Sequence, residues 1–259
     1  MSRMLRRTAP ALAAVTLLLA ACGGAGPALT DPREIVTQGL EAMGEVDSVH
    51  FALSVDGTAQ VPDLGGELNL SGTELSGDLD LANEEAAIEF SVPSMFGISG
   101  EVIQIGEDSY VRTSMTGETW SKSTLDEDTP IGDVTDPAAQ LDKVRAFLDK
   151  EGVDVEKLDD AECGEETCYA VRLTIPAEVL AEASEGGEMD PSELVGEALV
   201  LDLLFDREDR WLTQASTRIV AADVGELTLT LALSGFNDPV DIEAPPEDQV
   251  TEGGEGFPF

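Results

Sequence analysis

The residue with the clearest chemical potential is Cys22, a thiol that ends an apolar run. A basic start containing Arg3, Arg6 and Arg7 precedes this run, which extends from Ala9 to Ala21. A membrane-spanning helix needs about 20 apolar residues, so the shorter run is typical of a secretory signal. The small residues before Cys22 suit a protease that must hold extended backbone, and a thiolate is nucleophilic enough to form a thioether. The pattern predicts an exported chain with a modified cysteine.

Residues 19–22, Leu-Ala-Ala-Cys, resemble the lipobox of bacterial lipoproteins. This resemblance implies that residues 1–21 are a lipoprotein signal peptide and that Cys22 receives a diacylglyceryl group on sulfur. The new amino terminus is usually acylated as well, with palmitate as the expected chain, and two or three acyl chains hold a protein stably on a membrane. We therefore expect the lipidated cysteine and a flexible tether over residues 22–30, anchored to the outer face of the cell membrane. An ordinary secretory signal with a chance cysteine is the alternative.

Two further cysteines, Cys163 and Cys168, lie in the stretch DAECGEETCYAV. An exported chain favours a disulfide between them, and Gly164 in the interval suits a hairpin turn. The chain-entropy model gives such a small loop about 2 kcal/mol of stabilisation. A zinc site is not expected, because a lone C-x4-C pair is not a zinc pattern and the chain has a single histidine.

Catalysis of the serine–histidine type would have to use His50, the sole histidine, which we expect at the surface. The sequence contains no G-x-S-x-G nucleophile motif. The acidic loops around residues 126–133 and 159–166 fit solvated turns better than calcium sites. Glycoside hydrolysis by a pair of carboxylates stays an open alternative, because a chain this rich in Asp and Glu contains such pairs by composition alone. We expect no enzyme, no metal and no cofactor.

Charge narrows the choice of partners. The 259-residue chain carries 53 Asp and Glu against 14 Lys and Arg, a formal net charge of −39. Such a surface repels nucleic acid and anionic headgroups alike, so no nucleic acid partner is expected. Contact with lipid must then come from apolar burial, and the 42% hydrophobic content is enough for a core.

Two longer helices and two short helical segments are predicted. The first begins after Thr30 or Asp31 as the cap, with Pro32 in the first turn, and covers about 13 residues. The second covers residues 136–151 and ends at Gly152. Short helical segments are expected at 176–187 and 190–197.

The rest of the chain predicts strands, because apolar and polar residues alternate between turn residues. The expected strand regions are 48–57, 66–72, 76–83, 86–93, 100–114, 117–123, 156–176, 198–206, 210–223 and 225–236. The order of helices and strands predicts an α+β fold with one large antiparallel sheet and helices gathered on one face. We expect a single domain over residues 31–244 and a disordered acidic tail over 245–259.

Three stretches carry a family resemblance: DPREIVTQGLEAMGEVDSVHFALSVDG at residue 31, IQIGEDSYVRTSMTGETW at 103 and DPVDIEAPPE at 238. Together with the element order over most of residues 31–246, they look like the LppX/LprA/LprF/LprG family of actinobacterial lipoproteins, whose fold is similar to the LolA and LolB carriers. The resemblance implies a half-barrel sheet curved around helices with an apolar cavity between them. It implies that acylated lipids or glycolipids bind there and are carried across the envelope, with an envelope transporter as a partner.

Side chains on the apolar faces are the candidates for lining such a cavity, although each would serve equally as plain core. They are Leu40, Met43, Phe51, Leu53, Phe90, Met95, Phe96, Phe147, Leu148, Leu201, Leu203, Leu229 and Leu231. Met95 and Phe96 are unusual in a loop, and either guard a cavity mouth or tuck under the sheet edge.

Two functions follow. The first is an envelope-anchored carrier or chaperone of acylated lipids, which we expect to be a monomer. The second is a non-catalytic interaction lipoprotein of the same fold that tethers or regulates an envelope partner. The volume between the sheet and the helices distinguishes the two functions. A carrier keeps an apolar cavity there, whereas an interaction module fills that space and exposes an apolar patch elsewhere.

Overall fold

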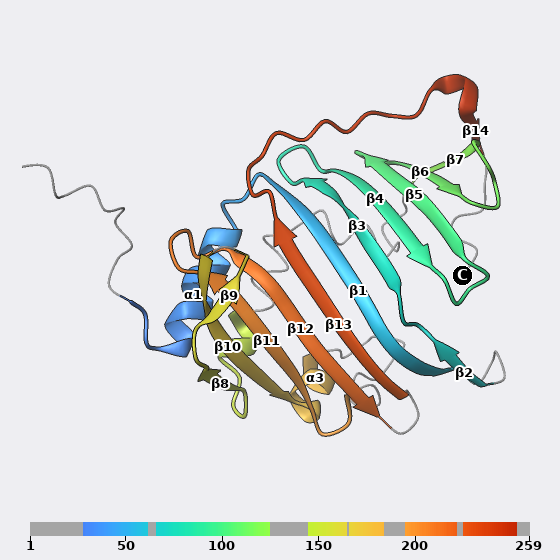
Figure 1. Cartoon of the computed structure of the whole chain (residues 1–259). Coiled ribbons are helices and arrows are strands. Elements are labelled where there is room, and N and C mark those ends of the chain that lie inside the picture. Colours follow the sequence, from blue (N-terminus) through green and yellow to red (C-terminus); the bar gives the residue numbers. More distant parts are fainter. Residues whose placement is uncertain are drawn as a thin grey trace, which may run out of the picture.

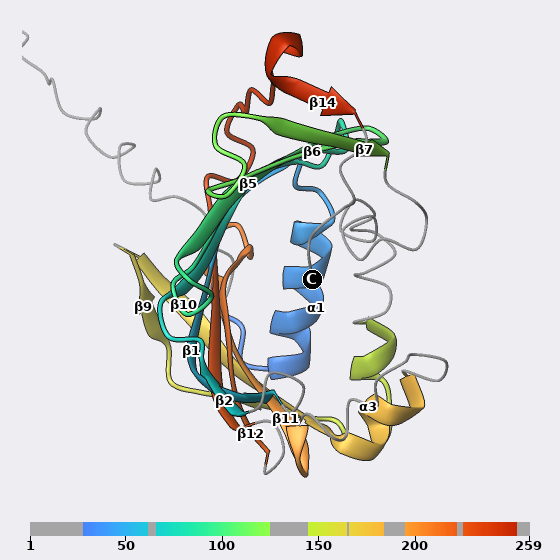
Figure 2. The ribbon, with the colours of Figure 1, turned by 90° about the vertical axis from the view of Figure 1, so that its right-hand side faces the viewer.

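The computed structural model describes residues 28–61, 66–124, 145–164, 166–183, 195–221 and 225–252. Its main feature is one large open antiparallel sheet (Figure 1). The sheet is curved, and the helices lie on its concave side (Figure 2). The predicted α+β fold, a half-barrel sheet with helices on its concave face, is therefore confirmed.

The sheet contains fourteen strands. They are β1 (Ser48–Val61), β2 (Gly66–Asn69), β3 (Thr73–Asp80), β4 (Glu85–Val92), β5 (Ile98–Ile105), β6 (Asp108–Thr113), β7 (Trp120–Thr124), β8 (Asp154–Lys157), β9 (Ala161–Cys163), β10 (Glu166–Pro176), β11 (Ala198–Asp206), β12 (Leu212–Ala221), β13 (Gly225–Ser234) and β14 (Val250–Glu252). Their order is β14-β7-β6-β5-β4-β3-β1-β13-β12-β11-β10-β8, with β2 paired to β1 and β9 to β10. Strand β1 therefore joins the meander β3–β7 to the strands of the second half of the chain.

Helix α1 (Pro32–Met43) begins as predicted. The Asp31 carboxylate accepts hydrogen bonds from the backbone N–H groups of Arg33 and Glu34, at 2.9 and 3.1 Å, and satisfies donors that a first helical turn leaves unpaired. Just before the helix, the Leu29 N–H donates to the Tyr169 hydroxyl at 3.0 Å. These contacts fix the start of α1 against β10.

Helix α3 (Ala177–Ala183) and a helical turn over residues 145–148 are the other α-helical parts of the described chain. The predicted helix at 136–151 is described only from residue 145 and ends at residue 148, three residues earlier than expected. Residues 136–144 and most of the segment predicted at 190–197 lie outside the described residues. No helix in the described ranges has the length and apolar character needed to cross a bilayer.

Helix α1 packs on strands β8 and β10–β12, and we call these four strands with α1 the packed half. The helix contributes Ile35, Val36 and Leu40 to a buried cluster, and β10 and β11 contribute most of the rest. Phe205 is 2% exposed there and Val171 is fully buried. This cluster is the hydrophobic core of the described chain.

The tail expected to be disordered over 245–259 differs from that expectation in part. Residues Glu247–Gln249 form a 3-10 turn, and β14 then pairs parallel with β7. The Thr251 hydroxyl also donates to the Trp120 carbonyl at 3.1 Å. The free edge of β7 offers hydrogen bonds that a polar tail can use, which composition alone does not reveal.

Candidate functional site

The concave face carries an apolar belt that runs across the sheet. Val171 lies opposite Leu203, Leu203 opposite Ala215, Ala215 opposite Leu231 and Leu231 opposite Leu53. Residues directly opposite one another in an antiparallel pair share a face. Because Val171 and Leu203 belong to the core under α1, the whole row faces the helices.

Beyond β12 the side chains of the belt become less buried. On β13, β1, β3 and β4, which we call the open half, its side chains are only partly buried, and none of them belongs to the packed core of the described residues. They are Phe51, Leu53, Val55, Leu75, Phe90, Leu229, Leu231 and Leu233. A broad apolar surface that the helix core does not saturate is what an acyl chain requires.

Among the buried polar side chains on this face, two carry an unpaired atom and were missed by sequence reasoning. Gln104 is 4% exposed and Thr73 is 7% exposed. The Gln104 Oε1 and Thr73 Oγ1 atoms have no hydrogen-bond partner in the described chain, an arrangement that proteins normally avoid. Gln104 lies two residues after Val102, and Thr73 lies two residues before Leu75. This alternation places each polar residue on the same face as its apolar neighbour, and it could have been read from the sequence. Both atoms are covered by the protein, so they would bond a ligand only after the side chains over them move.

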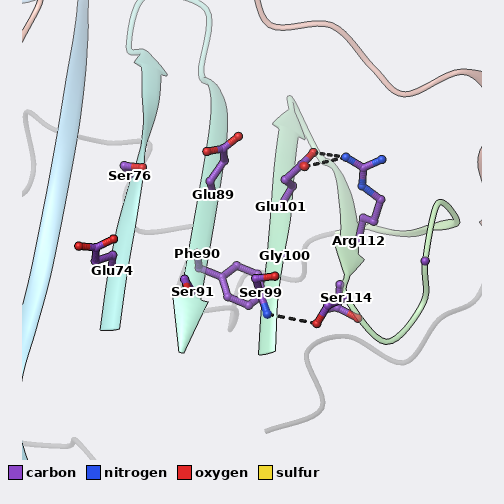
Figure 3. A pocket seen from close by; sticks show the side chains of 12 residues that line it. Glu74, Ser76, Glu89, Phe90, Ser91, Ser99, Gly100, Glu101, Arg112 and Ser114 are labelled. Carbon is purple, nitrogen blue, oxygen red and sulfur yellow. Dashed lines mark hydrogen bonds and ion pairs between the residues drawn. The ribbon is translucent and has the colours of Figure 1, made fainter. Parts of the chain in front are cut away.

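The convex face carries a different hollow, of about 510 Å³, over β3–β6 (Figure 3). It is lined by Glu74, Glu89 and Glu101, with Arg112 as its only basic residue. The Arg112 guanidinium pairs with Glu101 at 2.6 Å and lies 4.7 Å from the centre of the Trp120 ring. This acidic surface disfavours anions, and Phe90 is the one large apolar side chain among its lining residues.

His50 lies on the same convex face and is exposed, as predicted. Its Nδ1 lies 2.9 Å from a carboxylate oxygen of Asp78, beside a second hollow of about 270 Å³. No group of three or more His, Cys, Asp or Glu in the described ranges is arranged to hold a metal ion.

Cys163 and Cys168 are joined by a disulfide across the β9–β10 hairpin. Beside it, a hydrogen bond that the protonated Glu166 carboxyl donates to Asp206 raises the pKa of Glu166, and the negative charge of Asp206 adds to the effect. Burial acts to raise the pKa of Asp206, but hydrogen bonds from the backbone N–H groups of Asp209 and Glu208 outweigh it and lower that pKa. Asp206 stabilises the turn after β11 by accepting these two hydrogen bonds, and the pair lies away from the open half.

The candidate lining residues fall into three groups, and Met43 stands apart from them. Leu40, Leu148 and Leu203 are buried in the packed core, with Phe147 and Leu201 against it. The belt of the open half contains Phe51, Leu53, Phe90, Leu229 and Leu231, whereas Met43 is partly exposed at the end of α1. Met95 and Phe96 lie in the β4–β5 turn, where Phe96 is fully exposed. Cys22 lies outside the described residues.

Comparison with known proteins supports the fold. No protein-family model matches the sequence, and no curated protein does. Among solved structures, the Mycobacterium tuberculosis lipoprotein LppX matches with a TM-score of 0.50 and 19% identity, over 83% of this chain and 100% of LppX. LprF from Mycobacterium bovis matches with a TM-score of 0.55 and 16% identity, over 85% of this chain and 99% of LprF. At these identities, the likeness shows that the chain has the fold of LppX and LprF.

Proposed function

We propose that this protein is an exported lipoprotein, anchored to the outer face of the cell membrane through acylated Cys22. It binds an acylated lipid or glycolipid against the concave face of the open half and carries or chaperones it across the envelope. Membership of the LppX/LprF family, rather than a shared fold alone, is part of the same proposal.

The observation that carries this proposal is the apolar belt of the open half. Its Leu and Phe side chains lie on the same face of the sheet as the packed core, but they are only partly buried and do not belong to the buried cluster. Each CH₂ group of an acyl chain that leaves water is worth about 0.8 kcal/mol. A chain taken from a bilayer was already out of water, so net affinity is small and the lipid exchanges, as a carrier needs.

The polar atoms of this face indicate the kind of headgroup. Gln104 Oε1 accepts hydrogen bonds, and the Thr73 hydroxyl donates or accepts. The formal charge of −39 disfavours an anionic headgroup. A hydroxyl-bearing neutral lipid, such as an acylated glycerol or glycolipid, fits both properties.

Native mass spectrometry of the detergent-solubilised protein tests the proposal. We expect one or two acylated lipids to accompany the folded protein and to disappear on denaturation, with solvent extraction naming their class. A protein that keeps its bare mass after incubation with envelope lipids would contradict the carrier function and favour the interaction lipoprotein.

A matched pair of variants locates the site. Leu53 belongs to the belt, whereas the adjacent Ala52 is exposed on the convex face. Leu53→Asp places a charge against the acyl chains and should lower the lipid-bound fraction at least tenfold, because an unpaired charge is costly in an apolar site. Ala52→Asp adds the same charge and should leave lipid binding unchanged. Equal loss in both variants would place the lipid elsewhere.

A further inference from the structure

The turn between β4 and β5 carries an unusual aromatic residue. Phe96 is the most exposed large hydrophobic residue of the described chain, at 104% of its reference area. Its φ is +59°, in the left-handed region that a residue with a Cβ rarely occupies. The side chain thus covers nothing in the described fold, although its backbone is strained. A strained and exposed aromatic residue indicates a contact outside the molecule.

The turn is held firmly in this shape. The Gly97 N–H donates to the Pro93 carbonyl at 3.0 Å, and the Ile98 N–H donates to the Met95 carbonyl at 3.1 Å. Gly97 also has a positive φ, of +70°. Phe96 is therefore presented outward by a closed, hydrogen-bonded turn.

A second apolar side chain stands at the neighbouring turn. Met115, between β6 and β7, is 66% exposed. The two turns are joined at their base, because the Ser114 N–H donates to the Ser99 carbonyl at 2.7 Å and the Ser99 N–H donates to the Ser114 hydroxyl at 3.2 Å. We call Met95, Phe96 and Met115 the apolar tip.

Charge is absent from this part of the sequence. Residues 90–100 and 113–117 contain no Asp, Glu, Lys or Arg, although these residues make up 26% of the chain. The acids return directly at Glu89 and Glu101 on the strands behind the tip. Charged side chains are expensive in lipid, so an acidic protein that touches a bilayer needs such an uncharged contact point.

We propose that the apolar tip inserts Phe96 into the interface of a lipid bilayer. The serine hydroxyls behind it suit the headgroup level, where aromatic residues are favoured. Phe90 of the belt lies on β4, the strand that leads into this turn, so a bilayer at the tip would meet the end of the belt. In this respect the inference deepens the proposed function and rests on it, since the tip becomes the point where lipid enters or leaves.

Tryptophan fluorescence of the full-length protein with neutral phosphatidylcholine vesicles tests the insertion. In Phe96→Trp, we expect the added emission to shift to the blue and to be quenched by brominated phosphatidylcholine. The control is Ala82→Trp, an exposed position at the opposite end of the same strands, whose added emission should stay unquenched. Emission from the Phe96→Trp variant that matches the control would overturn the proposal and point to a protein groove as the partner of the tip.

Lipid transfer separates this inference from the proposed function. Phe96→Ser should slow the uptake of a fluorescent monoacylglycerol from vesicles by about tenfold, because it removes most of the apolar contact. Its equilibrium affinity for the same monoacylglycerol in vesicle-free buffer should equal that of the wild type. Loss of that affinity would make Phe96 part of the ligand site and would contradict the tip. A wild type that binds no monoacylglycerol, with the added emission of Phe96→Trp still quenched, would contradict only the proposed function.

Discussion

The packed half and the open half are built from the same kind of strand and differ in what covers them. Both present alternating leucine to the concave side, as in β11 and β13. Leu203 on β11 is 9% exposed and belongs to the core under α1, whereas Leu231 on β13 is partly exposed and does not. The comparison teaches that the same strand pattern is buried where α1 packs on it and stays partly exposed where the described core ends.

The largest expected effect comes from removing a phenylalanine from each half. Phe205→Ala should lower the free energy of unfolding by about 3–5 kcal/mol, because it leaves a cavity in the packed core. Phe51→Ala, in the open half, should cost about 1 kcal/mol in lipid-free protein, since its ring is only partly buried. Urea denaturation measures both, and equal losses would abolish the distinction between the halves.

The contact of α1 with the packed half gives the next effect. A Cβ on Gly39 would lie 2.3 Å from the Phe205 ring, so Gly39→Ala should cost about 1–3 kcal/mol. The better helix propensity of alanine, worth about 1 kcal/mol, offsets only part of this loss.

Two further variants test whether the clash with the Phe205 ring causes the loss of stability in Gly39→Ala. Phe205→Leu should partly rescue Gly39→Ala by removing the ring edge. Thr37→Ala, on the exposed side of α1, should be neutral or slightly stabilising. A stabilised Gly39→Ala would show that α1 is packed loosely and that the packed half resembles the open half.

The smallest effect is a pH dependence confined to the packed half. The raised pKa of Glu166 contributes stability that is fully present below the unfolded pKa and is lost as pH rises through the folded one. Near neutral pH, Glu166→Gln should therefore melt slightly higher than the wild type, and the two curves should converge in acid. The lowered pKa of Asp206 has the opposite effect on stability. The stability that ionised Asp206 contributes is lost only as pH falls through its pKa in the folded protein.

Glu162→Gln, on the same hairpin, removes the same charge without the Asp206 contact and is the control. A melting temperature that rises equally in both variants across the pH range would mean that general charge repulsion is responsible. The hydrogen bond between Glu166 and Asp206 would then have no part in the effect.

Much of the fold could be predicted because its signals are local. Asp31 and Pro32 mark the start of α1, and the alternation of residues 198–206 coincides with β11. The division of the sheet could not be predicted, because Leu203 and Leu231 lie in the same leucine alternation and differ only through the position of α1. The left-handed φ of Phe96 was likewise invisible, since Met-Phe-Gly permits several turns.

The pairing of β1 with β13 has a consequence for how the molecule is made. These neighbours join the two sides of the sheet through ten residue pairs, from His50 with Ser234 to Ala59 with Gly225. Strand β1 ends at Val61 and β13 begins only at Gly225, so the two sides of the sheet cannot join until all the strands between them have been synthesised. Such a late, long-range closure slows folding. In the proposed function this delay is useful, because it keeps the chain unfolded while it crosses the membrane.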